Sequence, residues 1–142
     1  MTNQNHLDRI IRFFESVSPE NVVTLVELYS ANAYFKDTFN EVKGLAAIMA
    51  IFEHMFEQVD EPRFLITRSI LQNDDAFIVW DFNFRMKGHL TQQIIHGSSH
   101  LRFGPDKKVE YHRDYWDAAE ELYEKIFVLG SLMRFLKRRA RS

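Results

Sequence analysis

The sequence predicts one α+β domain in which a curved antiparallel sheet wraps around helices from the first part of the chain. Apolar residues recur at helical spacing before residue 60, whereas short runs separated by turn residues follow residue 64. The length of 142 residues, with 46% hydrophobic and 27% charged residues, is typical of a single globular domain with a sizeable core. We therefore expect one domain over residues 1–142.

Three helices are predicted in the first part of the chain. The i, i+3, i+4, i+7 spacing of a helix face is followed by Leu7, Ile10, Ile11 and Phe14. Ser18 and Pro19 are typical of a helix start, and a second helix face after them is predicted from Val22, Leu25, Val26 and Tyr29. A short hairpin is expected over residues 34–42. The longest helix is expected over residues 45–59, because Pro62 cannot continue it.

Four antiparallel strands are predicted after residue 64. Turn residues separate them at positions 73–75, 87–88 and 104–107. Helical composition returns over residues 118–125 and 128–139, so residues 118–142 are expected to form a C-terminal helical extension. Its basic, amphipathic second part is expected to pack on the domain or on a second subunit, with an anionic membrane surface as the alternative.

Composition excludes several classes of function. A formal net charge of −2 provides no general attraction for nucleic acid, and no apolar run reaches the ~18 residues of a membrane span. The chain has no cysteine, which excludes disulfides and thiolate sites and favours the cytoplasm. His96 and His100 lie too far apart on one strand to bind one ion, so no metal site is predicted.

The alternation of side chains along the strands predicts an aromatic inner face and a polar outer face. Symmetric turns would pair Trp80 with Ile95 and Gly97 with Asp114. The inner face would then carry Ile78, Trp80, Phe82, Phe84, Ile95, Gly97, Ser99, His112, Asp114 and Trp116. The outer face would carry Asp81, Arg85, His96, His100, Arg102, Tyr111, Arg113 and Tyr115. The inner face is expected to pack against the helices.

Asp114 is the exceptional residue of the inner face. A carboxylate among aromatic side chains is costly unless it is hydrogen-bonded, paired or neutral. Gly97 opposite it would leave space for a ligand, which predicts a functional carboxylate in a pocket. The structural alternative is that His112 or a backbone amide satisfies Asp114, or that a β-bulge turns it outward.

The order of elements and the segment from Tyr111 to Asp117 resemble the nuclear transport factor 2-like superfamily in its SnoaL-like branch. That branch includes polyketide cyclases, ketosteroid isomerases, limonene epoxide hydrolases and scytalone dehydratases, as well as members without known activity. The resemblance spans roughly residues 5–120 and implies a cone-shaped, cystatin-like sheet. It also implies a homodimer, for which the outer face offers Tyr111, Tyr115 and several histidines.

The resemblance also implies roles for individual residues. Asp37 matches the general base of ketosteroid isomerases, while the positions of their catalytic tyrosine and acid fall at Phe13 and Ser99. Asp114 resembles the last-strand aspartate that serves as general acid or base in SnoaL-like cyclases. The Arg and Asp pair of the epoxide hydrolases has no counterpart on the inner face.

Two functions are therefore expected as alternatives. The first is a cofactor-independent isomerase, cyclase or dehydratase that acts on a hydrophobic small molecule through Asp37, Asp114 and His112. The second is a non-catalytic ligand-binding or interaction module with the same pocket. In both, the expected ligand contacts are Phe13, Trp80, Phe82, Phe84, Ile95, Gly97, Ser99 and Trp116.

Overall fold

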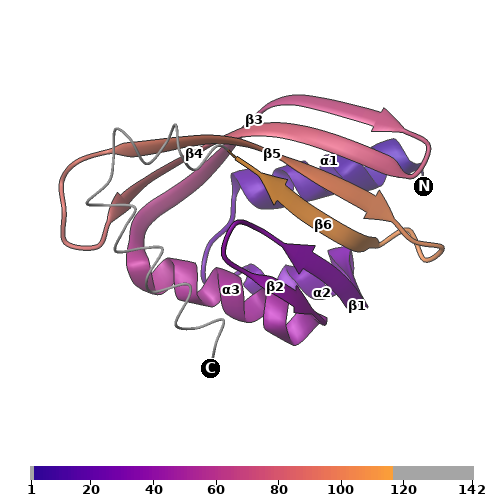
Figure 1. The fold of residues 1–142 in the computed structure, drawn as a ribbon, viewed down its shortest axis with the longest axis horizontal. Helices are drawn as coiled ribbons and strands as arrows, with labels where there is room; N and C mark the ends of the chain where they lie inside the picture. The colour runs from indigo at the N-terminus through magenta and orange to yellow at the C-terminus, as the bar shows by residue number, and fades with distance from the viewer. Residues whose placement is uncertain (1, 117–142) are drawn as a thin grey trace.

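The computed structural model describes residues 2–116 (Figure 1). They form a six-stranded sheet and several helices, which come before the first strand or between the second and third strands in the sequence. The helical elements are α1 (Asn3–Glu15), the short 3₁₀ turn η1 (Val22–Thr24), α2 (Leu25–Leu28) and α3 (Leu45–Gln58). Among residues 2–116 no helix has the length and apolar character that crossing a membrane requires. The expected helices of residues 118–142 lie outside the described residues.

The sheet combines a hairpin with a four-stranded meander. The hairpin consists of β1 (Tyr29–Lys36) and β2 (Glu41–Lys43). The meander consists of β3 (Val59–Gln72), β4 (Asp75–Met86), β5 (Gln93–Phe103) and β6 (Val109–Tyr115). The spatial order is β2-β1-β6-β5-β4-β3. In Figure 1, strands β3 to β5 arch over α1, and α3 lies below the hairpin.

The α+β class with a curved sheet is confirmed, but one strand pairing differs from the prediction. β1 pairs with β6 in parallel, whereas the other neighbouring strands run antiparallel. The sheet is therefore mixed. This parallel pairing joins the early hairpin to the last strand of the meander.

Helix α1 forms where its spacing predicts it. Thr2 caps the helix by accepting a hydrogen bond from the Asn5 amide at 3.2 Å. Its buried face consists of Leu7, Ile10, Phe13 and Phe14. This face packs against β3, which fixes α1 across the inner side of the sheet.

The second and third helices end earlier than predicted. Around Ser18 the chain forms a turn in which the Asn21 side chain accepts from the Ser18 amide at 2.8 Å, so no helix begins there. Tyr29 already belongs to β1 rather than to the second helix. Likewise Val59 is already the first residue of β3, where it pairs with Met86 of β4. Pro62 lies where the β3–β4 ladder is interrupted.

The two predicted registers of the meander are each wrong by two residues. Trp80 lies opposite Gly97, not opposite Ile95, because the β4–β5 loop is longer than a symmetric two-residue turn. Asp114 lies opposite Ser99, not opposite Gly97, because the β5–β6 ladder contains an irregularity next to Phe103. A shift of two residues keeps every side chain on its face, so the predicted faces are observed.

Candidate functional site

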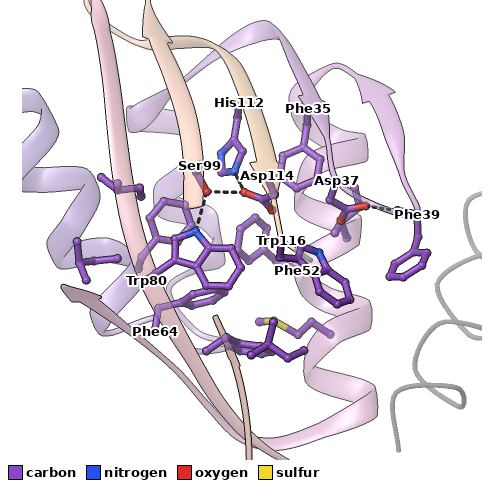
Figure 2. A pocket seen from close by; sticks show the side chains of 17 residues that line it. Phe35, Asp37, Phe39, Phe52, Phe64, Trp80, Ser99, His112, Asp114 and Trp116 are labelled. Carbon is purple, nitrogen blue, oxygen red and sulfur yellow. Dashed lines mark hydrogen bonds and ion pairs between the residues drawn. The ribbon is translucent and has the colours of Figure 1, made fainter. Parts of the chain in front are cut away.

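A cavity of about 140 Å³ lies between the inner face of the sheet and the helices α1 and α3. Its wall is formed mainly by apolar side chains, which include Phe14, Phe35, Phe52, Met55, Phe64, Trp80, Phe82 and Ile95. The polar groups of the wall are Asp37, Ser99, His112 and Asp114 (Figure 2). An apolar cavity with a few convergent polar groups is the usual form of a small-molecule site.

Asp114 is held by a hydrogen bond from Ser99. The indole Nε1 of Trp80 donates to Ser99 Oγ at 2.9 Å, and Ser99 Oγ lies 2.5 Å from Asp114 Oδ1. Because an indole N–H can only donate, Ser99 accepts from Trp80 and directs its own hydroxyl hydrogen to Asp114. Oδ1 of Asp114 therefore acts as an acceptor.

His112 links the same carboxylate to a buried tyrosine. Its Nε2 lies 2.6 Å from Asp114 Oδ1, and its Nδ1 lies 2.6 Å from the hydroxyl oxygen of Tyr29. The His112 side chain is only 3% exposed, whereas that of Asp114 is 20% exposed. Within residues 2–116 every hydrogen bond to the Asp114 side chain goes to Oδ1, which leaves Oδ2 free for a ligand.

Asp37 lies at the end of β1 and is held by the hairpin loop. Its Oδ1 accepts from the amides of Phe39 at 2.8 Å and Asn40 at 2.6 Å. The Asn40 side chain donates to both carboxyl oxygens at 3.1 Å. Burial raises the pKa of Asp37, the charge of Asp114 raises it further, and these effects outweigh the donors that favour the ionised form.

The parallel pairing of β1 with β6 brings the two carboxyl groups to one cavity. Phe35 is the partner of His112, and Lys36 is the partner of Arg113. One step further along both strands stand Asp37 and Asp114, both of which line the cavity. Residues 77 positions apart in the sequence thus line the same cavity.

The side chains expected around a ligand divide into two groups. Trp80, Phe82, Ile95, Ser99 and Trp116 line the cavity, together with the expected acid-base residues. Phe13, Phe84 and Gly97 do not belong to the lining.

Each of these three exceptions has a packing reason. Phe13 is buried beside Phe52, and Phe14, the next residue of α1, faces the cavity instead. Phe84 is completely buried and stacks on Phe82. Gly97 lies beneath the ring of Trp80, where an added Cβ would come within 2.4 Å of the ring carbon Cη2. The glycine therefore makes room for Trp80 and leaves no open space for a ligand.

Sequence reasoning missed two polar residues of the site. Tyr29 was expected on a helix face, but it begins β1 and its hydroxyl meets His112. Asn40 was not singled out, although it donates to Asp37. The Asp37-Thr38-Phe39-Asn40 segment, in which an aspartate can accept from amides two and three positions later, is a signal that could have identified the loop.

The described residues contain no group of three His, Asp or Glu side chains that could hold a metal ion. The histidines outside the cavity include His96, which meets Asp81 at 2.5 Å, and His100, which meets Asp75 at 2.7 Å. These pairs lie on the outer face of the sheet, so they are separate from the cavity.

Comparison with known proteins places this chain in a family. The family model of the SnoaL-like domain matches residues 10–112. A search of the curated proteins gives no match. Several solved structures are similar in fold.

One similar structure is a proposed SnoaL-like polyketide cyclase from Shewanella denitrificans, with 18% identity, a TM-score of 0.72, and coverage of 88% of this chain and 96% of the other. A nuclear transport factor 2-like protein of unknown function from Burkholderia pseudomallei has 11% identity, a TM-score of 0.73, and coverage of 87% and 97%. An LEH-like epoxide hydrolase from M. tuberculosis has 11% identity, a TM-score of 0.71, and coverage of 92% and 93%. At these identities the likeness shows the fold alone.

Proposed function

Because the chain belongs to the SnoaL-like domain family, we propose that it catalyses proton transfer at carbon in a small apolar carbonyl compound. Isomerases, cyclases and dehydratases use this chemistry. One observation carries the proposal: two carboxyl groups from distant parts of the chain line a single cavity whose wall is otherwise mostly apolar. A carboxyl group in such a cavity is an effective acid or base because little water competes with it.

The two carboxyl groups would take different roles. Asp114 is the base, since its Oδ1 is occupied by Ser99 and His112 while Oδ2 is free to accept a proton from carbon. Asp37 is the acid, since its raised pKa favours the form that donates a hydrogen to the substrate carbonyl oxygen. This assignment reverses the role of base that resemblance to the ketosteroid isomerases implies for Asp37.

In an isomerisation the proton would move between two carbons. Asp114 takes a proton from the carbon next to the carbonyl group, and the resulting enolate oxygen is stabilised by the hydrogen from Asp37. Asp114 then returns the proton to a carbon further along the conjugated system, which leaves the enzyme unchanged. His112 lines the cavity, but both of its nitrogens are engaged with protein groups, so it supports Asp114 and does not meet the substrate oxygen.

The cavity favours a substrate with about one ring. Its volume is about 140 Å³, and an engineered apolar cavity of about 150 Å³ in another protein binds benzene. A monocyclic ketone fits within this volume, whereas a four-ring steroid would extend out of it. The aromatic wall supplies the dispersion contacts that an apolar ring requires.

Cyclohex-3-enone is a suitable test compound, because its conversion to cyclohex-2-enone needs one proton removed and one returned. The conjugated product is followed by its ultraviolet absorbance. We expect the protein to exceed the buffer rate, with each proton-transfer group contributing about 10²–10⁴-fold. A rate equal to that of buffer, together with no uptake of solvent deuterium next to the carbonyl group, would leave a ligand-binding module as the function.

We also infer that the chain forms a homodimer through the outer face of the sheet. Large apolar side chains are exposed there, with Phe77 at 45%, Val79 at 42% and Tyr115 at 46% exposure. Static light scattering is expected to give twice the 16.9 kDa of one chain. The variant Val79→Arg should reduce the mass to that of the monomer, whereas a wild-type mass of one chain at micromolar concentration would contradict the inference.

A further inference from the structure

The hydroxyl group of Tyr29 is a buried group that the proposed chemistry does not use. Tyr29 is 1% exposed, and His112 Nδ1, at 2.6 Å, is its hydrogen-bond partner within residues 2–116. Tyr29 lies outside the lining of the cavity, so it cannot touch a substrate there. Its contact with His112 nevertheless places it two hydrogen bonds away from the carboxylate of Asp114.

We propose that Tyr29 is a positioning residue that donates to His112 Nδ1 and so supports the tautomer whose hydrogen on Nε2 points at Asp114 Oδ1. The neutral imidazole ring carries one hydrogen, so the group that donates to one nitrogen decides which nitrogen carries it. The proposal rests on the proposed function only for the statement that Asp114 is the base.

Hydrogen-bond counting supports this direction. A phenol hydrogen that is buried needs an acceptor, and His112 Nδ1 is the acceptor at hand. Nδ1 is then without hydrogen, and the ring hydrogen is on Nε2, which points at Asp114 Oδ1. Burial and the charge of Asp114 both raise the pKa of Tyr29, which keeps the phenol in its donating form.

The opposite arrangement leaves groups unsatisfied. If Nδ1 carried the hydrogen, it would donate to the Tyr29 oxygen, and the phenol hydrogen would have no acceptor among the described residues. Nε2 would then become an acceptor facing a carboxylate oxygen, and the two lone pairs would repel unless Asp114 were protonated. A protonated Asp114 could not serve as the base. The tautomer of His112 and the protonation of Asp114 are therefore linked through Tyr29.

The test uses the full chain with ¹⁵N-labelled histidine at pH 7.5. Long-range ¹H–¹⁵N spectra distinguish the two nitrogens of each ring, and the signal of His112 is identified by its loss in His112→Asn. We expect wild-type His112 to show hydrogen on Nε2. Tyr29→Phe removes the hydroxyl group and keeps the ring, so Nδ1 loses its hydrogen-bond donor and its ¹⁵N signal should move toward that of an imidazole nitrogen without a hydrogen bond. The matched control is Tyr34→Phe, which removes a hydroxyl on the same strand that contacts Glu41, and which should leave the spectrum of His112 unchanged.

Activity provides an independent readout. Tyr29→Phe should lower kcat for cyclohex-3-enone about tenfold and leave KM unchanged. If Tyr29→Phe does not fold, 3-fluorotyrosine incorporation preserves the shape and strengthens the donor, and it should shift the Nδ1 signal of His112. Wild-type hydrogen on Nδ1, or an Nδ1 signal of His112 that neither change shifts, would overturn the inference. If the NMR spectra agree with the inference but the protein has no isomerase activity, only the proposed function is overturned.

Discussion

Replacing Asp114 with asparagine is expected to lower kcat for cyclohex-3-enone by about 10²–10⁴-fold, because an amide cannot accept the proton from carbon. Asparagine has the same shape and can still accept from Ser99 and His112 at its oxygen. The fold and KM should therefore change little. Thermal unfolding followed by circular dichroism, measured together with the steady-state kinetics, separates lost chemistry from lost structure.

The matched control for this substitution is Asp81→Asn. Asp81 is also a strand aspartate that meets a histidine, His96, but it lies on the outer face away from the cavity. Its replacement should leave kcat unchanged. If Asp114→Asn retained the wild-type kcat, Asp114 would not be the base, and its Oδ2 would not accept the proton from carbon.

Gly97→Ala is expected to reduce the cavity and to destabilise the protein. The added Cβ would lie 2.4 Å from Cη2 and 2.6 Å from Cζ2 of Trp80, far inside van der Waals contact. The indole must then move away from β5, toward the space that it borders. Overpacking of this kind costs about 1–3 kcal/mol of unfolding free energy. The move would also break the hydrogen bond from Trp80 to Ser99 and so loosen the support of Asp114.

Urea unfolding and calorimetric titration with cyclohex-2-enone measure the two effects. We expect a lower free energy of unfolding and an affinity reduced by about tenfold, which corresponds to about 1.4 kcal/mol. Gly104→Ala is the control, because its new Cβ would meet the end of the Glu110 side chain at 2.8 Å, and that side chain is exposed and can move. Equal stability and affinity in the two variants would show that Gly97 is not needed for the position of Trp80.

The faces of the sheet could be predicted from sequence, but the neighbours within a face could not. Alternation alone assigns Trp80, Ser99 and Asp114 to the inner side, and an error of two residues in register does not change that assignment. Contacts depend on the true register, which a loop and a bulge set. The pairing of Ser99 with Asp114 could therefore not be predicted from the sequence. Gly97 was expected to leave space for a ligand, but it makes room for the ring of Trp80.

The shared cavity of Asp37 and Asp114 required information that local sequence does not contain. Residues of one strand can be placed relative to each other by counting, but the parallel pairing of β1 with β6 joins segments that are separated by five other elements. Resemblance to the family implied that both aspartates belong to one pocket, but it did not predict the pairing of β1 with β6 that brings them together. The role of Tyr29 was also not predicted, because its spacing from Val22 and Leu25 indicates a helix, whereas Tyr29 is the first residue of β1.

The claim that Asp37 and Asp114 form an interacting pair in one cavity is tested most directly by titrating the Asp37 carboxyl carbon by ¹³C NMR. The signal is assigned by its absence in Asp37→Asn. In the wild type the pKa of Asp37 should lie above 3.8, because burial and the charge of Asp114 both favour the protonated form. In Asp114→Asn the pKa of Asp37 should fall toward 3.8 and remain above it, since burial is the larger cause. A wild-type pKa of 3.8, or one that Asp114→Asn leaves unchanged, would contradict the account.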